Sequence, residues 1–374
     1  TGVETITATV DTGTDTLALA KVSGVTTLTA SSGTDASTLN VTGLNSGATV
    51  VLSDADVDTA TIDTAASATL TIDTQVALAG AITVADATSV TVQNTGSAAG
   101  DLNALALDTV DTTSLTLNAG TNGGVDVGAV TATNKLATLT LTGQTTGQDV
   151  DMVSMVDADA LTSLTLTANG GDTTVSGAIG TSATASGNAE ALATITATAS
   201  NTGTITLTNV YADDSTNGTT ASATAADLAM TVTGTAGTNS EVAFGTIVNT
   251  YGTITLTTSG LGTAGSTALT ADDITGTISA IGTHAAMTAT DDVTLTVSNA
   301  GAVVLSALTA GAAATGAITV TATGAGALTI SDVNASAGAL TVTGTDATGV
   351  ISVDGSDWTG TATLTGGSKA DSLV

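Results

Sequence analysis

The sequence is dominated by short stretches in which an apolar residue alternates with Thr, Ala or Ser. Alternation with a period of two places successive side chains on opposite faces of an extended chain, which is typical of a β-strand. Thr and Val also fit the pleated surface of a sheet, and residues that favour turns lie between the stretches. Clear examples are Leu70-Thr71-Ile72, Ile82-Thr83-Val84, Leu115-Thr116-Leu117, Leu164-Thr165-Leu166, Ile254-Thr255-Leu256, Ile318-Thr319-Val320 and Leu340-Thr341-Val342.

The predicted strands follow one another at nearly constant intervals. Regular short strands are typical of β-sandwich arrays and of β-solenoids. We favour an all-β fold of the solenoid type, a parallel β-helix, because the spacing barely varies and small, similar residues recur at equivalent places. Two strands then form one coil of about 20–22 residues, and equivalent Thr and Val side chains form ladders. Tandem β-sandwich domains are the alternative. The first strand centres are Ile6, Leu17, Leu28, Leu39, Val51 and Ile62.

The amino-acid composition limits which folds and which classes of function are expected. The 374 residues include no Cys, Pro or Arg, three Lys, one His (His284) and four aromatic residues. A thick core draws much of its burial from aromatic side chains, so a thin, elongated core is expected. Most active sites also need clustered charged or aromatic side chains. We therefore expect no enzyme and predict no catalytic or cofactor-binding residue; a β-helical polysaccharide lyase or hydrolase is the enzymatic alternative.

The formal net charge of −30 comes almost entirely from Asp. Such a charge repels nucleic acid and anionic membrane surfaces, so neither is expected as a partner. It attracts cations, and carboxylate oxygens suit Ca²⁺. Grouped carboxylates repel one another unless a cation lies between them, although acidic residues near turns are also ordinary solvated groups. The candidate ligands are Asp54, Asp56 and Asp58, then Asp213 with Asp214, Asp272 with Asp273, and Asp291 with Asp292.

The strand pattern lapses over residues 181–190 and again over 211–226, which indicates loops that project from the solenoid or a joint between two strand-rich halves. We expect residues 1–210 to form the first half of the solenoid, 211–226 an irregular loop or joint, and 227–365 the second half. The uncharged stretch 301–330 is interrupted by Thr, Ser and Gly. It lacks the continuous apolar run of a membrane span, so we expect further strands there and no membrane span in the chain.

The last nine residues, 366–374, carry the most specific motif. Gly366-Gly367-Ser368-Lys369-Ala370-Asp371-Ser372-Leu373-Val374 resembles the nonapeptide of calcium-binding RTX repeats, with Lys369 in place of the third glycine. The resemblance implies the start of an RTX-like repeat and adds Asp371 to the candidate calcium ligands. A Gly-Gly turn that closes the last strand is the alternative.

The opening Gly2-Val3-Glu4-Thr5-Ile6 and the overall composition are similar to those of bacterial surface-layer (S-layer) and RTX-type secreted proteins. This resemblance implies an extracellular, cell-surface location, type I secretion, calcium-dependent assembly and attachment to surface polysaccharide through another region. We expect a structural protein that self-assembles into a layer or filament. The stalk of a large type I-secreted adhesin is the alternative. Because the chain starts without Met or a signal peptide, we expect a piece of a longer protein.

Overall fold

In the computed structural model, the described residues form 32 β-strands and no helix. All strand pairs whose register is defined are parallel, which confirms the predicted β-solenoid. The described residues are 3–11, 13–32, 37–54, 57–96, 100–107, 111–120, 122–131, 135–156, 158–180, 189–212, 226–234, 241–260, 263–265, 268–279, 281–311, 316–334 and 338–374.

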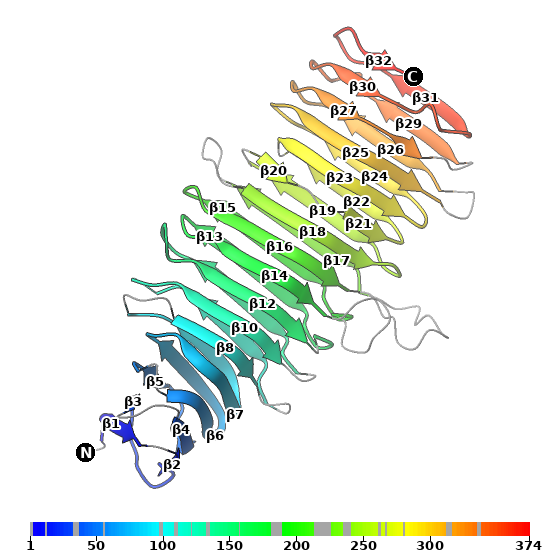
Figure 1. The fold of residues 1–374 in the computed structure, drawn as a ribbon. Helices are drawn as coiled ribbons and strands as arrows, with labels where there is room; N and C mark the ends of the chain where they lie inside the picture. Colours follow the sequence, from blue (N-terminus) through cyan, green and yellow to red (C-terminus); the bar gives the residue numbers. More distant parts are fainter. Residues whose placement is uncertain are drawn as a thin grey trace. The chain divides into compact units, whose positions relative to one another are not determined.

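The chain divides into two compact units, Thr1–Thr181 (unit 1) and Ser182–Val374 (unit 2). Within each unit the chain winds in coils, and each strand pairs with the equivalent strand of the next coil (Figure 1). Most of the predicted joint, residues 211–226, lies outside the described part of the chain, apart from Tyr211, Ala212 and Ala226.

Unit 1 contains two parallel sheets. Sheet I consists of β1 (Thr5–Val10), β3 (Thr27–Ser32), β5 (Ala48–Leu52), the second parts of β6 (Val57–Thr74) and β7 (Leu78–Gln93), β9 (Ser114–Asn118), β11 (Thr138–Gly143) and β13 (Ser163–Asn169). Sheet II consists of β2 (Gly13–Ala18), β4 (Ser37–Leu44), the first parts of β6 and β7, β8 (Gly100–Ala106), β10 (Val125–Thr131), β12 (Val150–Val156) and β14 (Thr173–Ile179).

Unit 2 repeats this plan. Sheet III consists of β15 (Thr194–Ser200), β17 (Leu228–Gly234), β19 (Ile254–Ser259), β22 (Ile274–Ile278), β24 (Val293–Val297), β26 (Ile318–Ala322), β29 (Ala339–Thr343) and β31 (Thr361–Thr365). Sheet IV consists of β16 (Thr204–Tyr211), β18 (Glu241–Asn249), β20 (Thr263–Gly265), β21 (Ala268–Ala271), β23 (Gly282–Ala289), β25 (Val303–Ala310), β27 (Leu328–Ile330), β28 (Val333–Asn334), β30 (Ile351–Val353) and β32 (Ser372–Leu373).

The core consists of rows of small apolar side chains, one from each coil. Alternation places every second residue of a strand inward, and the parallel register stacks those residues on their counterparts. Each coil therefore buries its apolar side chains mainly against its neighbours, as expected for a solenoid. One such row in sheet I is Ile6, Leu28, Val50, Ile72, Val92, Leu117, Leu141 and Leu166, all fully buried except Ile6 near the chain start.

At the start of unit 1 the number of residues per coil agrees with the predicted value of about 20–22. Further along the unit the coils become longer. Thr5 pairs with Thr27, and Thr27 pairs with Thr49, so the first coils have the same length. Further along, Thr91 pairs with Thr116, which makes that coil longer than the first ones. Longer turns between the strands account for the difference, because the strands themselves keep their register.

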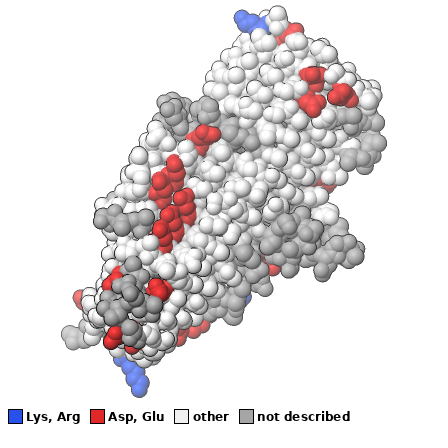
Figure 2. Space-filling model, in the orientation of Figure 1, with Lys and Arg blue, Asp and Glu red and all other residues white. Residues whose placement is uncertain are grey.

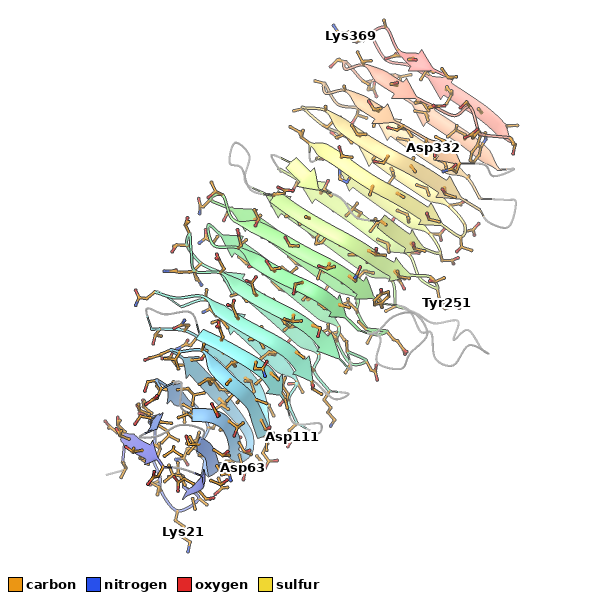
Figure 3. All side chains as sticks on the ribbon, in the orientation of Figure 1. Lys21, Asp63, Asp111, Tyr251, Asp332 and Lys369 are labelled. Atoms are coloured by element: carbon orange, nitrogen blue, oxygen red, sulfur yellow. The ribbon has the colours of Figure 1, made fainter. Side chains whose placement is uncertain are left out.

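The few large polar side chains lie mostly at turns. Lys21 follows β2, and Tyr251 is 40% exposed in the turn between β18 and β19 (Figure 3). The uncharged stretch 301–330 contains β25, β26 and β27, as predicted. Among the described residues there is no helix long and apolar enough to cross a membrane.

Candidate functional site

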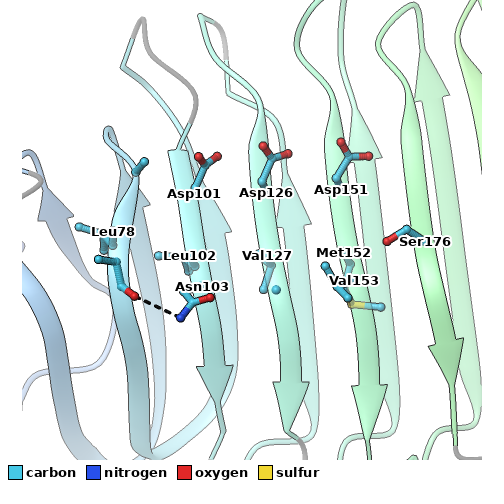
Figure 4. Close-up of a pocket in the computed structure, with 13 residues that line it drawn as sticks. Leu78, Asp101, Leu102, Asn103, Asp126, Val127, Asp151, Met152, Val153 and Ser176 are labelled. Atoms are coloured by element: carbon cyan, nitrogen blue, oxygen red, sulfur yellow. Dashed lines mark hydrogen bonds between the residues drawn. The ribbon is translucent and has the colours of Figure 1, made fainter.

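Three aspartates occupy the same register position in successive coils of sheet II. Asp101 in β8 pairs with Asp126 in β10, and Asp126 pairs with Asp151 in β12. The next residue in this row is Thr174 in β14. Neighbouring parallel strands lie ~4.8 Å apart, so the three carboxyl groups form a closely spaced row, which we call the acidic ladder (Figure 4). Figure 2 shows acidic side chains gathered in a run on unit 1.

The acidic ladder lines a groove of about 600 Å³ on sheet II. The lining also includes Leu102, Val127 and Met152, but their side chains are buried in the core. Beside the carboxyl groups, the outward positions of the same strands are Asn103, Gly128 and Val153 (Figure 4). Val153, also in the lining, is 52% exposed. Within the same groove, Asn103 Nδ2 of β8 donates a hydrogen bond of 3.1 Å to the Ala79 carbonyl of β7.

A close approach of the backbone shapes this groove. Gly128 lies between two register pairs of β10 and β12, Val127 with Met152 and Ala129 with Ser154. A Cβ atom at this position would lie 1.8 Å from the Asn103 carbonyl oxygen. Since backbone atoms cannot yield as a side chain can, only glycine fits here without a shift of the strand.

Stacking of the carboxyl groups changes their acidity. Burial, followed by a hydrogen bond and charge repulsion from Asp101, raises the pKa of Asp126 to about 7. Burial also raises the pKa of Asp151, although a hydrogen bond from Thr174 opposes that rise. One oxygen of Asp101, Oδ1, is enclosed and has no hydrogen-bond partner. The acidic ladder thus carries excess negative charge near neutral pH, and either a proton or a cation would relieve it.

Four of the predicted calcium ligands come together in unit 2. Asp272 and Asp273 precede β22, and Asp291 and Asp292 precede β24, at the same corner of the next coil. The Asp291 amide donates to the Asp272 carbonyl at 2.8 Å. The charges of Asp292, Asp273 and Asp272 raise the pKa of Asp291. We call these four residues the corner cluster.

Two members of the corner cluster have a structural role in addition to their charge. Asp273 Oδ1 accepts a hydrogen bond of 3.0 Å from the Asp292 amide, and Asp292 Oδ1 accepts one of 2.7 Å from the Ala317 amide. Asp227, at the same corner of an earlier coil, accepts one of 3.1 Å from Thr253. An aspartate before a sheet III strand therefore binds the backbone of the following coil at this corner.

Of the remaining predicted ligands, the structure describes Asp54, Asp58 and Asp371, and none of these belongs to a group of three or more side chains suited to a metal ion. Asp56, Asp213 and Asp214 lie outside the described residues. Asp54 precedes β6, and Asp58 lies partly buried within it. Asp371 accepts hydrogen bonds from the Ile351 amide at 2.8 Å and the Gly367 amide at 2.7 Å, one on each carboxylate oxygen. Both oxygens of Asp371 thus bind backbone within the last coils.

Sequence reasoning missed the acidic ladder because its members are distant in the chain. Asp101, Asp126 and Asp151 recur at equal intervals, each one coil after the last. The predicted calcium ligands, in contrast, are mostly residues that lie close together in the sequence. A signal existed: each of the three aspartates stands directly before a large apolar residue, namely Leu102, Val127 and Met152.

His284 is the one buried imidazole of the chain. It points into unit 2 from β23, is 4% exposed, and its Nε2 atom has no hydrogen-bond partner. Burial lowers its pKa to about 4. With no Cys and no second His in the sequence, a zinc site of the usual kind is not expected here.

No group of three or more His, Cys, Asp or Glu side chains within the described part of the chain is arranged to hold a metal ion. Comparison with family models, with curated proteins and with solved structures finds no match for this chain.

Proposed function

We propose that this chain is a structural, extracellular protein that self-assembles into a layer or filament on a bacterial cell, with calcium at the contacts between copies. The observation that carries the proposal is the stacking of carboxyl groups in the acidic ladder and the corner cluster. Such rows repel one another between copies of a chain whose net charge is −30. A divalent cation turns that repulsion into a contact.

The ligand geometry supports sites shared between molecules rather than within one. Carboxylate oxygens are suitable Ca²⁺ ligands, but the ion takes six to eight of them. Asp273 and Asp292 each use one oxygen for a backbone amide, and no three carboxylates in the described part of the chain are arranged to hold a metal ion. Oxygens from a second copy would complete the coordination shell, and assembly would then depend on calcium.

Two alternatives remain distinct from this proposal. An adhesin stalk would use the same coils as a spacer and would stay monomeric. A β-helical polysaccharide hydrolase is favoured only by the acidic ladder, since paired carboxyl groups of different pKa are typical of such enzymes. The described lining of the groove contains no aromatic or basic side chain on which a sugar could stack or be held, which argues for the structural role.

Electron microscopy of negatively stained protein tests the proposal directly. With millimolar calcium we expect ordered sheets or filaments, and with chelator we expect them to dissolve. Isolated particles in both conditions would contradict self-assembly and favour the adhesin stalk. Release of reducing sugar from a polysaccharide, abolished by Asp126→Asn, would contradict the non-enzymatic role.

Charge-matched variants locate the calcium contacts. Asp272→Asn with Asp291→Asn removes two charges from the corner cluster while retaining the backbone-binding Asp273 and Asp292. We expect it to raise the calcium concentration needed for assembly. The control, Asp346→Asn with Asp357→Asn, removes two exposed charges elsewhere in unit 2. Equal effects of the two variants would mean that only the net charge matters.

A further inference from the structure

Two rows of threonines run across the whole of sheet III. In every coil the two positions are separated by one inward-facing residue, and fifteen of the sixteen residues are Thr. The first row is Thr194, Ala229, Thr255, Thr275, Thr294, Thr319, Thr341 and Thr363; the second is Thr196, Thr231, Thr257, Thr277, Thr296, Thr321, Thr343 and Thr365.

The backbone sets the spacing of this array, which we call the threonine lattice. Along each row the repeat is the ~4.8 Å distance between neighbouring strands, and across the rows it is two residues of strand, ~6.6 Å. None of the sixteen side chains is buried. The hydroxyls of Thr255 and Thr275 lie 3.1 Å apart and share a hydrogen bond along the row. The lattice is therefore exposed and held in order by the sheet beneath it.

Strand propensity alone does not explain the lattice, because sheet IV has the same architecture without it. The equivalent sheet IV row is Thr206, Ala243, Gly265, Thr283, Val304, Thr329, Ser352 and Ser372, with three threonines among eight residues. In sheet I one row is entirely Thr, but the row beside it contains Val51, Asp73, Gln93 and Asn118. Among the rows compared, two neighbouring rows with Thr at fifteen of sixteen positions occur in sheet III.

The threonine lattice is also neutral on a strongly acidic molecule. None of the eight sheet III strands contains a charged residue, although the chain carries 33 acidic residues. The nearest described carboxylates, such as Asp273 and Asp292, lie at the corner before the strands, where they bind backbone amides. A partner of this face therefore needs no charge, and one that repeats on a similar grid can contact many of the threonines at once.

We propose that the threonine lattice binds the surface of ice. Oxygen atoms on exposed faces of ordinary ice repeat in rectangular grids with spacings close to those of the lattice. Each Thr offers a hydroxyl that can take the place of a water oxygen and a methyl group around which water is already ordered. Single contacts of this kind are weak, but a rigid array makes many at once without ordering costs for each.

Partition into ice is the direct test. The purified chain is frozen slowly from dilute solution onto a cold surface, and the protein is measured in the ice and in the remaining liquid. The freezing point and melting point of a single ice crystal are measured in the same solution. We expect the chain to be enriched in the ice and to separate the two temperatures. Exclusion from ice like an ordinary solute, with no gap between the temperatures, would overturn the proposal.

Matched variants assign the effect to sheet III. Thr296→Tyr raises a bulky side chain in the middle of the second row and should abolish enrichment in ice. Thr283→Tyr makes the same change at an exposed position of sheet IV and should leave it intact. Circular dichroism must show equal folding of both; if Thr296→Tyr does not fold, Thr277→Lys replaces it. Equal enrichment of the two variants would overturn the assignment.

A neutral face of this kind can also be covered by a second copy of the chain. Sedimentation of the protein in the presence of chelator distinguishes such a dimer from a monomer that binds ice. We expect the wild-type chain to sediment as a monomer under the conditions of the ice experiment. A wild-type dimer that Thr296→Tyr converts to a monomer, without any enrichment of the wild type in ice, would overturn the proposal. That outcome leaves the calcium-dependent assembly of the corner cluster untouched, because chelator is present throughout.

Discussion

Sheet II of unit 1 and sheet III of unit 2 are built in the same way but present different surfaces. In both, parallel register places a residue of one coil directly beside its counterpart in the next. In sheet II this stacks Asp101, Asp126 and Asp151, and in sheet III it stacks threonines. Stacking thus repeats the side chain of one register position in successive coils. Repeated carboxyl groups form the acidic ladder, in which like charges repel one another, whereas repeated hydroxyl groups form the neutral threonine lattice.

Gly128→Val should have the largest effect. Its Cβ would overlap the Asn103 carbonyl oxygen, so β10 must move away from β8 and the acidic ladder loses its register. We expect a loss of about 3–5 kcal/mol in the free energy of unfolding. Amide hydrogen exchange in unit 1 measures it. Val153→Ala, at an exposed position of the same groove, should change the value by less than about 0.5 kcal/mol; similar losses for both would contradict this explanation.

His284 should make unit 2 sensitive to acid. Its pKa of about 4 in the folded state lies below the ordinary 6.5, so the unfolded chain binds the proton more tightly. The contribution to stability is complete above pH 6.5, declines as the pH falls, and is lost by about pH 4, a change of roughly 3 kcal/mol. All four aromatic residues lie in unit 2, so Trp358 fluorescence can follow its unfolding. His284→Leu should remove this acid dependence; an unchanged profile would show that another group titrates.

The acidic ladder should give unit 1 the opposite pH dependence. The folded pKa of Asp126, about 7, lies above its ordinary value of 3.8, so the folded state binds the proton more tightly. Its stabilising effect is complete below pH 3.8 and is lost as the pH rises through 7. We expect the protection factors of the unit 1 amides, which compare the observed exchange rate with that of free peptide at the same pH, to fall over that range, and Asp126→Asn to flatten the profile. Protection factors that fall on acidification from pH 7 to 4 would contradict the prediction.

Thr296→Val should have the smallest effect on stability. Valine retains the β-branched shape that suits a strand, and the lost hydroxyl is exposed. We expect the free energy of unfolding of unit 2 to change by less than about 0.5 kcal/mol, measured by denaturant titration of Trp358 fluorescence. A loss above about 1 kcal/mol would mean that the threonine lattice stabilises the fold, which would be a sufficient reason for its presence.

The strands and their stacking could be predicted from the sequence because both rest on local alternation. Leu70-Thr71-Ile72 and Ile318-Thr319-Val320 lie in strands with the expected inward and outward positions. Neighbours across coils were harder to predict. Turn lengths make the coil that begins at Thr91 longer than the one that begins at Thr5, so the partner of a given residue cannot be counted from the sequence. Which residues form the acidic ladder and the threonine lattice depends on the number of residues in each coil.

The hydrogen bonds between coils have a mechanical consequence. They run along the direction in which the coils of a unit are stacked, so a force that peels the chain away from one end of a unit breaks the bonds of the terminal coil first. Coils should therefore detach one at a time, and the rest of the unit keeps its register because each coil contacts mainly its neighbours. A released coil such as the one from Thr5 to Thr27 adds roughly 70 Å of extended chain. Each unit can thus lengthen stepwise under tension, and the breaking of each coil's hydrogen bonds dissipates part of the mechanical work.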